Sequence, residues 1–179
     1  MDNILFISQP MTGFDDDAIR AYRQRVQFLV SIMIDDPDIE LIDQFDVIED
    51  PEDLEDLNEN QIRQFRLHRS LEMMKDANIV VFAPGWWNSP GCIQEYIERK
   101  LYMRGALVIF GNQIQDMTKA LYGETSPEYD FEAEKKVMDS VDTLLKNLTN
   151  KPAKINIGAP SVKYKKPTPK TQSSTRNTC

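Results

Sequence analysis

The sequence predicts an α/β fold of doubly wound type, with helices on both faces of a mainly parallel sheet of four to five strands. Three short runs, Ile4 to Ile7, Ile79 to Ala83 and Ala106 to Phe110, are continuously apolar instead of alternating. Strands that are buried on both faces have this pattern. A weaker strand is predicted at Ile39 to Ile42. Helical patterns separate these runs, and this alternation is typical of parallel β-α-β units.

The predicted helices have apolar residues at spacings of three and four. They span residues 16–34, 59–77, 89–104 and 131–149. Asp15 to Asp17 suit the N-terminus of the first helix, and Gly105 ends the third. The last helix follows the sheet, so the expected fold is flavodoxin-like or Rossmann-like with an added C-terminal helix.

Two further stretches have no clear element. Residues 111–129 contain Gly123 and Pro127 and are predicted to be a long linker, either a lid or a partner contact. Residues 35–59 hold 13 carboxylates and no Lys or Arg. Acids scattered through a strand and a loop more often form a solvated edge than a metal site, and no metal site is predicted.

Charge divides the chain into an acidic body and a basic tail. The tail, residues 150–179, has seven Lys or Arg and no acid, so residues 1–149 carry a net charge of −15. The tail is rich in Pro, Ser and Thr, and we expect it to be disordered. A weak contact with nucleic acid through the tail is one interpretation. A solvated tail, or one that folds back on the acidic body, is the interpretation we favour.

Composition excludes several classes of protein. No apolar run approaches the roughly 18 residues of a membrane span, and the start of the chain lacks the pattern of a secretory signal. We therefore expect a soluble, cytoplasmic protein without a membrane partner. Cys92 and Cys179 lie in different contexts, so no structural disulfide is expected, and a single histidine argues against a zinc cluster.

Ligands of open α/β sheets bind beyond the carboxyl ends of the strands. Three loops of this chain follow predicted strands, at residues 8–13, 43–46 and 84–91. In the third loop, Ser89 and Pro90 suit the N-cap and the first position of a helix. The free N–H groups of such a helix start favour an anionic or hydroxyl-bearing ligand, although a plain capped helix has the same pattern.

Glu95 lies about one and a half turns into that helix, away from its apolar side. Its side chain faces either solvent or the cleft at the strand ends. A surface pair with Arg99, four residues on, also explains a glutamate at this position. The periodicity does not choose between these interpretations.

Two motifs resemble the nucleoside 2-deoxyribosyltransferase superfamily, especially its short bacterial and phage members. They are "FISQPMTG" at 6–13 and "ANIVVFAPGWWNSPGCIQEYIERKLYMRGALVIF" at 77–110. The resemblance covers residues 3 to about 111. The superfamily also includes 2'-deoxynucleoside 5'-monophosphate N-glycosidases. The resemblance thus implies a nucleoside or nucleotide substrate, no cofactor, and a homo-oligomer, a dimer or higher.

The resemblance assigns roles to individual residues. Glu95 matches the family's nucleophile, which attacks the anomeric carbon of a deoxyribosyl group as retaining glycosidases do. Ser89 and Gly91 match residues that hold sugar or phosphate oxygens. Trp86 and Trp87 would offer a base a flat face or lid, although one of them could equally pack into the core or onto a second subunit. The expected substrate-binding residues are Ser8, Gln9, Met11, Thr12, Gly13, Asp43, Trp86, Trp87, Asn88, Ser89 and Gly91.

The chain departs from the family pattern at two positions. Ser70 stands where an aspartate is expected, and a hydroxyl cannot replace an ionisable carboxyl group. Asp76 would point elsewhere on the helix, whereas His68 is a candidate substitute. Gln9 stands where glycine is usual, and it would either narrow the approach of a phosphate or contact a base.

Three hypotheses follow. The first is an enzyme that cleaves or transfers the N-glycosidic bond of a 2'-deoxynucleoside or its 5'-monophosphate. The second is a protein on the same fold that binds a nucleotide or ribosyl ligand without turnover, and the third is an interaction protein. We favour the enzyme because Ser89, Gly91 and Glu95 occur together.

Overall fold

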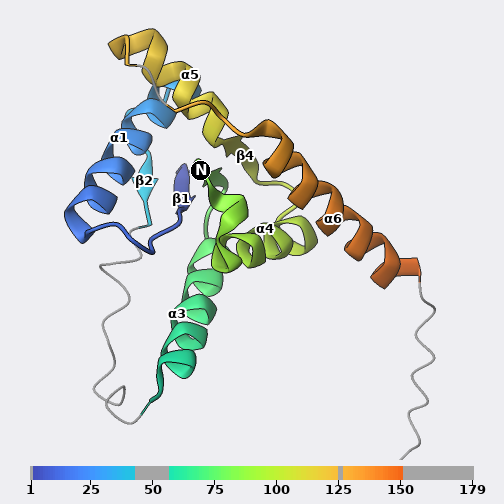
Figure 1. Ribbon diagram of the computed structural model, residues 1–179. Helices are drawn as coiled ribbons and strands as arrows, with labels where there is room; N and C mark the ends of the chain where they lie inside the picture. Colours follow the sequence, from blue (N-terminus) through green and yellow to red (C-terminus); the bar gives the residue numbers. More distant parts are fainter. Residues whose placement is uncertain (1, 43–56, 125–126, 151–179) are drawn as a thin grey trace, which may run out of the picture.

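The computed structural model describes residues 2–42, 57–124 and 127–150. Its centre is a parallel sheet of four strands in the order β2-β1-β3-β4 (Figure 1). The strands are β1 (Ile4–Ser8), β2 (Glu40–Leu41), β3 (Ile79–Phe82) and β4 (Leu107–Phe110). Ser8 is level with Phe82, and Phe82 with Phe110, so three strands end at the same edge of the sheet.

Helices cover both faces of this sheet, which confirms the predicted doubly wound α/β fold (Figure 1). One face carries α1 (Asp16–Ile34) and α5 (Gly111–Tyr122), and the other carries α3 (Glu59–Met74), α4 (Pro90–Tyr102) and α6 (Phe131–Asn150). A short 3₁₀ helix, η2 (Trp86–Asn88), connects β3 to α4. The added C-terminal helix is therefore present, as α6.

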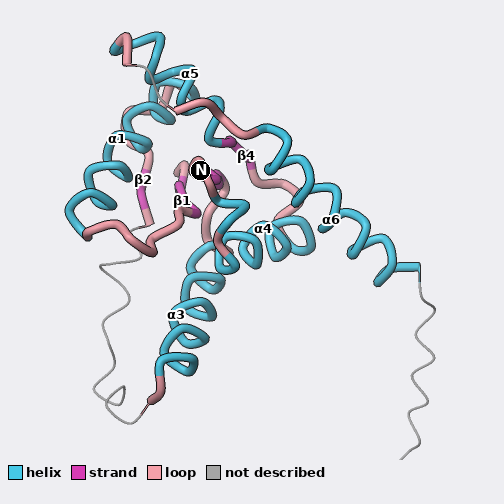
Figure 2. The backbone as a smooth tube through the Cα atoms, viewed as in Figure 1, coloured by secondary structure: helices cyan, strands magenta, loops and turns pink. Residues whose placement is uncertain are grey.

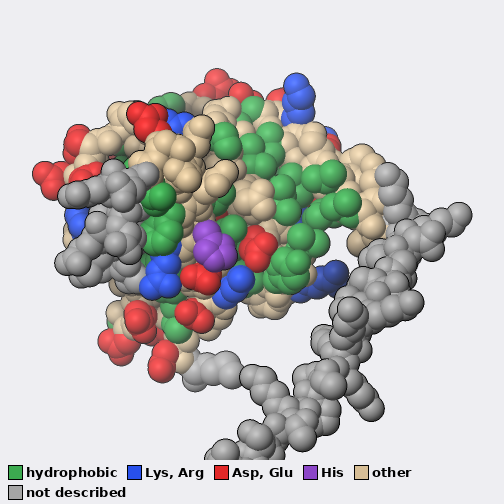
Figure 3. All heavy atoms as spheres, turned by 90° about the horizontal axis from the view of Figure 1, so that it is seen from below, with side chains coloured by type: hydrophobic (Ala, Val, Ile, Leu, Met, Phe, Trp, Pro, Cys, Tyr) green, Lys and Arg blue, Asp and Glu red, His purple; other side chains and the backbone are tan. Residues whose placement is uncertain are grey.

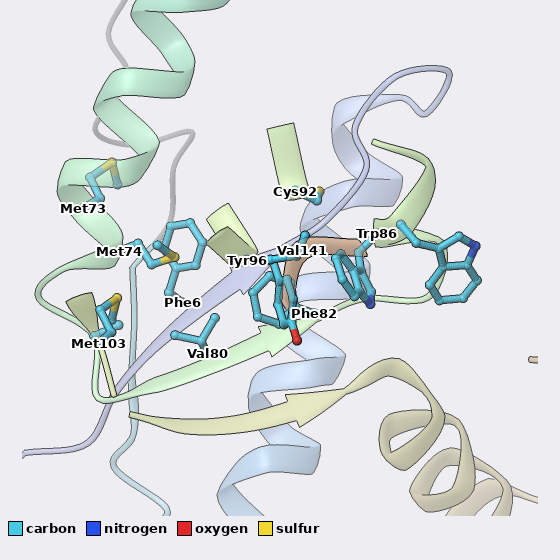
Figure 4. Close-up of a cluster of buried hydrophobic side chains, with 12 residues drawn as sticks. Phe6, Met73, Met74, Val80, Phe82, Trp86, Cys92, Tyr96, Met103 and Val141 are labelled. Atoms are coloured by element: carbon cyan, nitrogen blue, oxygen red, sulfur yellow. The ribbon is translucent and has the colours of Figure 1, made fainter. Parts of the chain in front are cut away.

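Successive side chains of a strand point to opposite faces, and this alternation divides the core in two. Leu5 and Ile7 of β1 pack against residues of α1 and α5. Phe6 points to the other face, into a cluster with residues of β3, η2, α3, α4 and α6 (Figure 4). Ser8 has the same parity as Phe6, so its hydroxyl belongs to the face that carries α3 and α4.

Local capping signals account for the helix starts. Asp15 accepts a hydrogen bond from the backbone of Ala18 at the start of α1. Asn58 and Gln61 form a reciprocal capping box at the start of α3. Ser89 caps α4, and Pro90 is its first residue, as predicted. The other predicted boundaries lie within three residues of those observed.

The prediction of a linker over 111–129 is wrong for residues 111–122, which form α5 (Figure 2). Ile114 and Thr118 are the buried face of this helix. A Cβ atom at Gly111 would lie 2.6 Å from the backbone nitrogen of Pro84, so glycine allows α5 to start directly against the loop after β3. The linker was predicted from Gly123 and Pro127, whereas Gly123 is the residue that ends α5, with a left-handed φ of 67°.

The apolar spacing in α1 predicts a core face of Ile19, Tyr22, Val26, Leu29 and Met33. This prediction is wrong for Met33, which is 36% exposed, and Arg23 is buried beside Val26 and Val30 instead. Within the described residues, no helix is long and apolar enough to cross a membrane. The predicted tail, Cys179 and most of the acidic stretch lie outside the described residues.

Candidate functional site

The carboxylate of Glu95 is held by two serine hydroxyls from different parts of the chain. Ser8 Oγ donates a hydrogen bond to Oε2 at 2.5 Å, and Ser70 Oγ donates one to Oε1 at 2.6 Å. Glu95 is only 6% exposed. Of the two orientations left open by the sequence, the side chain has the one directed toward the strand ends. Arg99 donates instead to the carbonyl of Ala106.

The fold explains why these three residues meet. Ser8 is the last residue of β1 and points to the α3/α4 face. Glu95 lies in the second turn of α4, which starts near the same edge of the sheet. Ser70 lies on the buried side of α3, which packs against α4. The strand order places β1 beside β3, with β2 and β4 outside them, so Ser8 lies where the direction of winding reverses. Such switch points are where open α/β sheets bind ligands.

The environment of Glu95 acts on its ionisation in two directions. Burial raises the pKa of its carboxyl above the usual 4.5, because the charged form loses its water. Hydrogen bonds from Ser70 and Ser8, and the positive charge of Arg23, lower that pKa and offset part of the effect. Arg23 is itself buried in α1 and donates to the carbonyl of Ile7 at 3.5 Å. Glu95 is therefore a desolvated carboxyl group whose ionised form is stabilised by two hydroxyl donors and one nearby positive charge.

Cys92 lies one helical turn before Glu95 and is buried. Burial and the nearby charge of Glu95 raise the pKa of the Cys92 thiol to about 11, although hydrogen bonds to Ser8 and Ser89 act against this. The thiol is therefore protonated at neutral pH and forms an uncharged wall beside the carboxylate.

The N-terminus of α4 leaves room for a ligand group. Ser89 Oγ accepts a 3.5 Å hydrogen bond from the backbone nitrogen of Cys92. A Cβ atom at Gly91 would meet only Ser89 Oγ, at 3.9 Å. No other described residue comes within 4 Å of that position, so the space beside Gly91 is open. Free N–H groups of this first turn are suited to an oxygen-rich group.

Of the two interpretations of the tryptophan pair, Trp86 follows the second and packs into the core instead of offering a face to a base. Its side chain is completely buried, and its ring packs against Phe82 and Tyr96 (Figure 4). The indole Nε1 donates a 2.8 Å hydrogen bond to Glu134 of α6. Trp86 is enclosed because α6 covers it. Trp87 is 8% exposed and meets the ring of Tyr129 edge to face, at a centroid distance of 5.1 Å.

The remaining predicted binding residues are not all gathered at Glu95. Met11, Thr12 and Gly13 lie in the exposed loop after β1, and Gly13 has a positive φ of 90° that favours glycine. Asn88 is exposed at the end of η2. Gln9 is half-buried, and its side-chain oxygen has no hydrogen-bond partner among the described residues. Asp43 lies outside the described residues.

The structure places Ser70 in direct contact with Glu95, at the position where the resemblance expects an aspartate. His68 does not substitute for that aspartate. Its side chain is 74% exposed and lies 3.5 Å from Glu72 on the same helix, at the surface seen in Figure 3. Asp76 is exposed as well. The group that contacts Glu95 from α3 is thus a hydroxyl.

Sequence reasoning missed three features of this site: the bond from Ser8 to Glu95, the buried thiol of Cys92, and the charge of Arg23. The parity of β1 could have indicated the orientation of Ser8. Arg23 occupies a position on the apolar stripe of α1, four residues after Ile19, and a charged residue there was a usable signal.

Comparisons of the chain with protein-family models, with curated proteins and with solved structures each gave no match. Among residues 2–42, 57–124 and 127–150, no group of three or more His, Cys, Asp or Glu side chains is arranged to hold a metal ion.

Proposed function

We propose that this protein cleaves or transfers the N-glycosidic bond of a 2'-deoxynucleoside or its 5'-monophosphate, with Glu95 as the nucleophile. The observation that carries the proposal is the Glu95 carboxylate, buried near the strand ends and aimed by Ser8 and Ser70. The two sequence motifs that contribute Ser8 and Glu95 are those that resemble the deoxyribosyltransferases.

The reaction has two displacements. In the first, a Glu95 oxygen forms a bond to the anomeric carbon, and the bond from that carbon to the base nitrogen breaks. The base leaves with the electron pair and takes a proton from water. In the second, water or another base attacks the same carbon and gives up a proton to solvent, and the bond from that carbon to the Glu95 oxygen breaks, so that the configuration is retained. The carboxylate also stabilises the oxocarbenium-like transition states between these steps.

The neighbours of Glu95 prepare it for this role. Ser8 and Ser70 restrict the carboxylate to one orientation, which lowers the entropic cost of attack. Each carboxylate oxygen of Glu95 accepts a hydrogen bond from one serine hydroxyl. When one of these oxygens bonds to the sugar, the serine that donates to it turns its hydroxyl away. Rotation about one side-chain bond is sufficient for this change.

The start of α4 would bind the oxygen-rich side of the substrate. The open space at Gly91 and the first-turn N–H groups lie within two helical turns of Glu95. A sugar hydroxyl or a 5'-phosphate fits the positive end of the helix dipole. This favours a nucleoside or nucleotide over a free base as the molecule that occupies the site.

One observation supports a second candidate, a protein that binds the same ligands without turnover. The partner of Glu95 from α3 is the hydroxyl of Ser70, which cannot exchange a proton at neutral pH as a carboxyl group does. If protonation of the leaving base requires such a group, the site binds its ligand and does not release a base.

The test is release of free base from a panel of deoxynucleosides and their 5'-monophosphates, followed by chromatography. We expect release by the wild-type chain and none by Glu95→Ala. Glu98→Ala is the matched control, because Glu98 lies on the same helix and faces Lys75, 3.8 Å away. Release that survives Glu95→Ala would exclude the proposed nucleophile. Saturable binding without release by the wild-type chain would favour the second candidate.

We also propose that the protein works as a homo-oligomer. The large apolar side chains of Phe28 and Ile32 on α1, and of Leu144 and Leu148 on α6, are about half exposed. Exposed apolar side chains close together on a helix often mark an interface. Analytical ultracentrifugation of the full chain should show a dimer or larger species, and a monomer at all concentrations would contradict this.

A further inference from the structure

A second candidate site lies on the opposite side of the loop that follows β3. A cavity of about 490 Å³, open to solvent on one side, is lined by residues of α1, α5, this loop and residues 127–130 ahead of α6. Its volume is in the range of small-molecule pockets. The lining residues are Tyr22, Arg25, Pro84, Gly85, Trp87, Ile114, Gln115, Thr118, Glu124, Pro127, Glu128, Tyr129 and Asp130. Ser8, Ser70 and Glu95 do not line it.

The walls of this cavity are aromatic and held in place. Trp87 and Tyr129 meet at an interplanar angle of 73°. The Tyr129 hydroxyl donates a 2.7 Å hydrogen bond to Glu134, which also accepts from the neighbouring Trp86. Pro84 and Ile114 complete an apolar lining. A preformed aromatic wall favours a flat ring, because neither partner has to lose much conformational freedom on binding.

Two polar side chains of α5 contribute hydrogen-bonding groups. Gln115 is half-buried, and its amide offers a donor and an acceptor side by side. Thr118 is buried and donates to the carbonyl of Ile114 at 2.8 Å, so its oxygen remains available as an acceptor. An amide of this kind pairs with a heterocycle edge that presents an adjacent acceptor and donor.

The charges at the cavity disfavour an anion. Arg25 is the basic residue of the lining, and it donates to Glu124 at 2.8 Å. Its guanidinium also lies 5.8 Å from the ring centroid of Tyr122. Glu124, Glu128 and Asp130 add negative charge to the lining. An anionic ligand would have to compete with Glu124 for Arg25 and would meet the repulsion of the other carboxylates.

From these features we propose that the cavity binds a neutral or cationic heteroaromatic ring that carries adjacent donor and acceptor groups. The ring lies against Trp87 and Tyr129, and its polar edge pairs with the amide of Gln115. This is a binding site separate from Glu95. It goes beyond the proposed glycosidic chemistry and does not depend on it.

The test uses calorimetric titration of the full chain with adenine, a ring with these groups. We expect saturable binding that is about tenfold weaker in Gln115→Leu, because the polar edge of the ring then loses its partner. Thr118→Val, which keeps the side-chain shape, should weaken binding about threefold. Gln64→Leu is the matched control on the exposed side of α3, and it should bind adenine as the wild type does. Thermal unfolding of each variant checks that it is folded.

Three further measurements locate the site and test its charge. Gly91→Phe would fill the open space at the start of α4, and Glu95→Gln alters the proposed nucleophile; both should leave adenine binding unchanged. Adenosine 5'-monophosphate should bind this cavity at least about tenfold more weakly than adenine, measured in Gly91→Phe. No adenine binding by the wild type, equal binding by Gln115→Leu, loss in Gly91→Phe, or tighter binding of the monophosphate would overturn the proposal. Failure to release base would not, since adenine binding is measured without turnover.

Discussion

Two buried glutamates of this protein have the same degree of burial and very different surroundings. Glu95 is 6% exposed and Glu134 is 7% exposed. Each carboxylate oxygen of Glu95 accepts one hydrogen bond, from the hydroxyl of Ser8 or of Ser70. Glu134 accepts the indole N–H of Trp86 and the phenol of Tyr129, both on Oε1.

The difference concerns how easily each carboxylate can change its partners. A serine hydroxyl rotates about a single bond, and the open start of α4 is close to Glu95. Trp86 is a large ring packed against Phe82 and Tyr96, so its N–H cannot turn away without disturbing the core. Burial alone therefore does not identify a reactive carboxylate. In this comparison, rotatable hydrogen-bond donors and open space beside the carboxylate distinguish the proposed nucleophile Glu95 from Glu134.

The largest expected effect is on chemistry at Glu95. Glu95→Ala should lower the rate of base release by a factor of about 10⁴ or more, as loss of a nucleophile does in other enzymes. Its unfolding transition should remain cooperative. Single-turnover measurements by chromatography, with denaturant unfolding of the same sample, check both expectations. If Glu95→Ala instead lost stability but released base at the wild-type rate, Glu95 would be the structural glutamate, which contradicts the comparison.

The next effect is on stability at Glu134. Glu134→Ala should lower the free energy of unfolding by about 2–4 kcal/mol, because it leaves two donors without an acceptor, one of them on the fully buried Trp86. Glu134→Gln keeps an acceptor oxygen and should cost about 1 kcal/mol. Urea unfolding followed by tryptophan fluorescence measures both. Equal losses for Ala and Gln would show that the hydrogen bonds contribute little.

A third prediction concerns the loop after β3, which carries Trp86, the partner of Glu134, and leads into α4, the helix of Glu95. Gly111→Ala should cost about 1–3 kcal/mol, because the added carbon meets Pro84 at the start of that loop. Gly105→Ala is the control, since a Cβ atom there meets nothing within 4 Å. Thermal unfolding of the pair is the measurement. If the two variants were equally stable, Gly111 would not support the loop.

A smaller effect is expected at Ser70. Ser70→Ala removes one donor to Glu95 and should lower kcat/KM for base release by about tenfold. Because that donor holds down the pKa of the Glu95 carboxyl, the acidic limb of the pH profile should move to higher pH. A profile at an unchanged position would mean that Ser70 does not act on the ionisation of Glu95.

The smallest signal is the pH dependence of stability. The pKa of Glu95 is raised by burial, so the folded state holds its proton more tightly than the unfolded state. The contribution of this group to the free energy of unfolding is fully present below its unfolded pKa of about 4.5. This contribution is lost as the pH rises through the raised pKa of the folded state. Glu95→Gln removes this loss, so its stability relative to the wild type should increase with pH. Parallel stability curves from pH 4 to 8 would contradict the raised pKa.

Local sequence pattern was sufficient for most of the fold. The apolar runs of β1, β3 and β4 predicted their positions to within one residue, because strands buried on both faces need continuous apolar side chains. Ser89 and Pro90 predicted the start of α4 for an equally local reason, the geometry of a helix N-terminus. α5 was missed because Gly123 and Pro127 indicated a linker, whereas Gly123 ends a helix that packs on the sheet through Ile114 and Thr118.

The candidate site, unlike the fold, depends on contacts between residues that are far apart in the sequence. The sequence by itself determined that Glu95 lies in the helix after β3 and that the loops after the strands share one edge of the sheet. Only the tertiary structure decided which groups hold Glu95, because Ser70 and Ser8 are 25 and 87 residues away along the chain. It also decided that Trp86 is enclosed, since the acceptor of its indole N–H lies 48 residues further on, in α6. Periodicity orients a side chain relative to its own helix or strand, whereas its partners depend on how those elements pack.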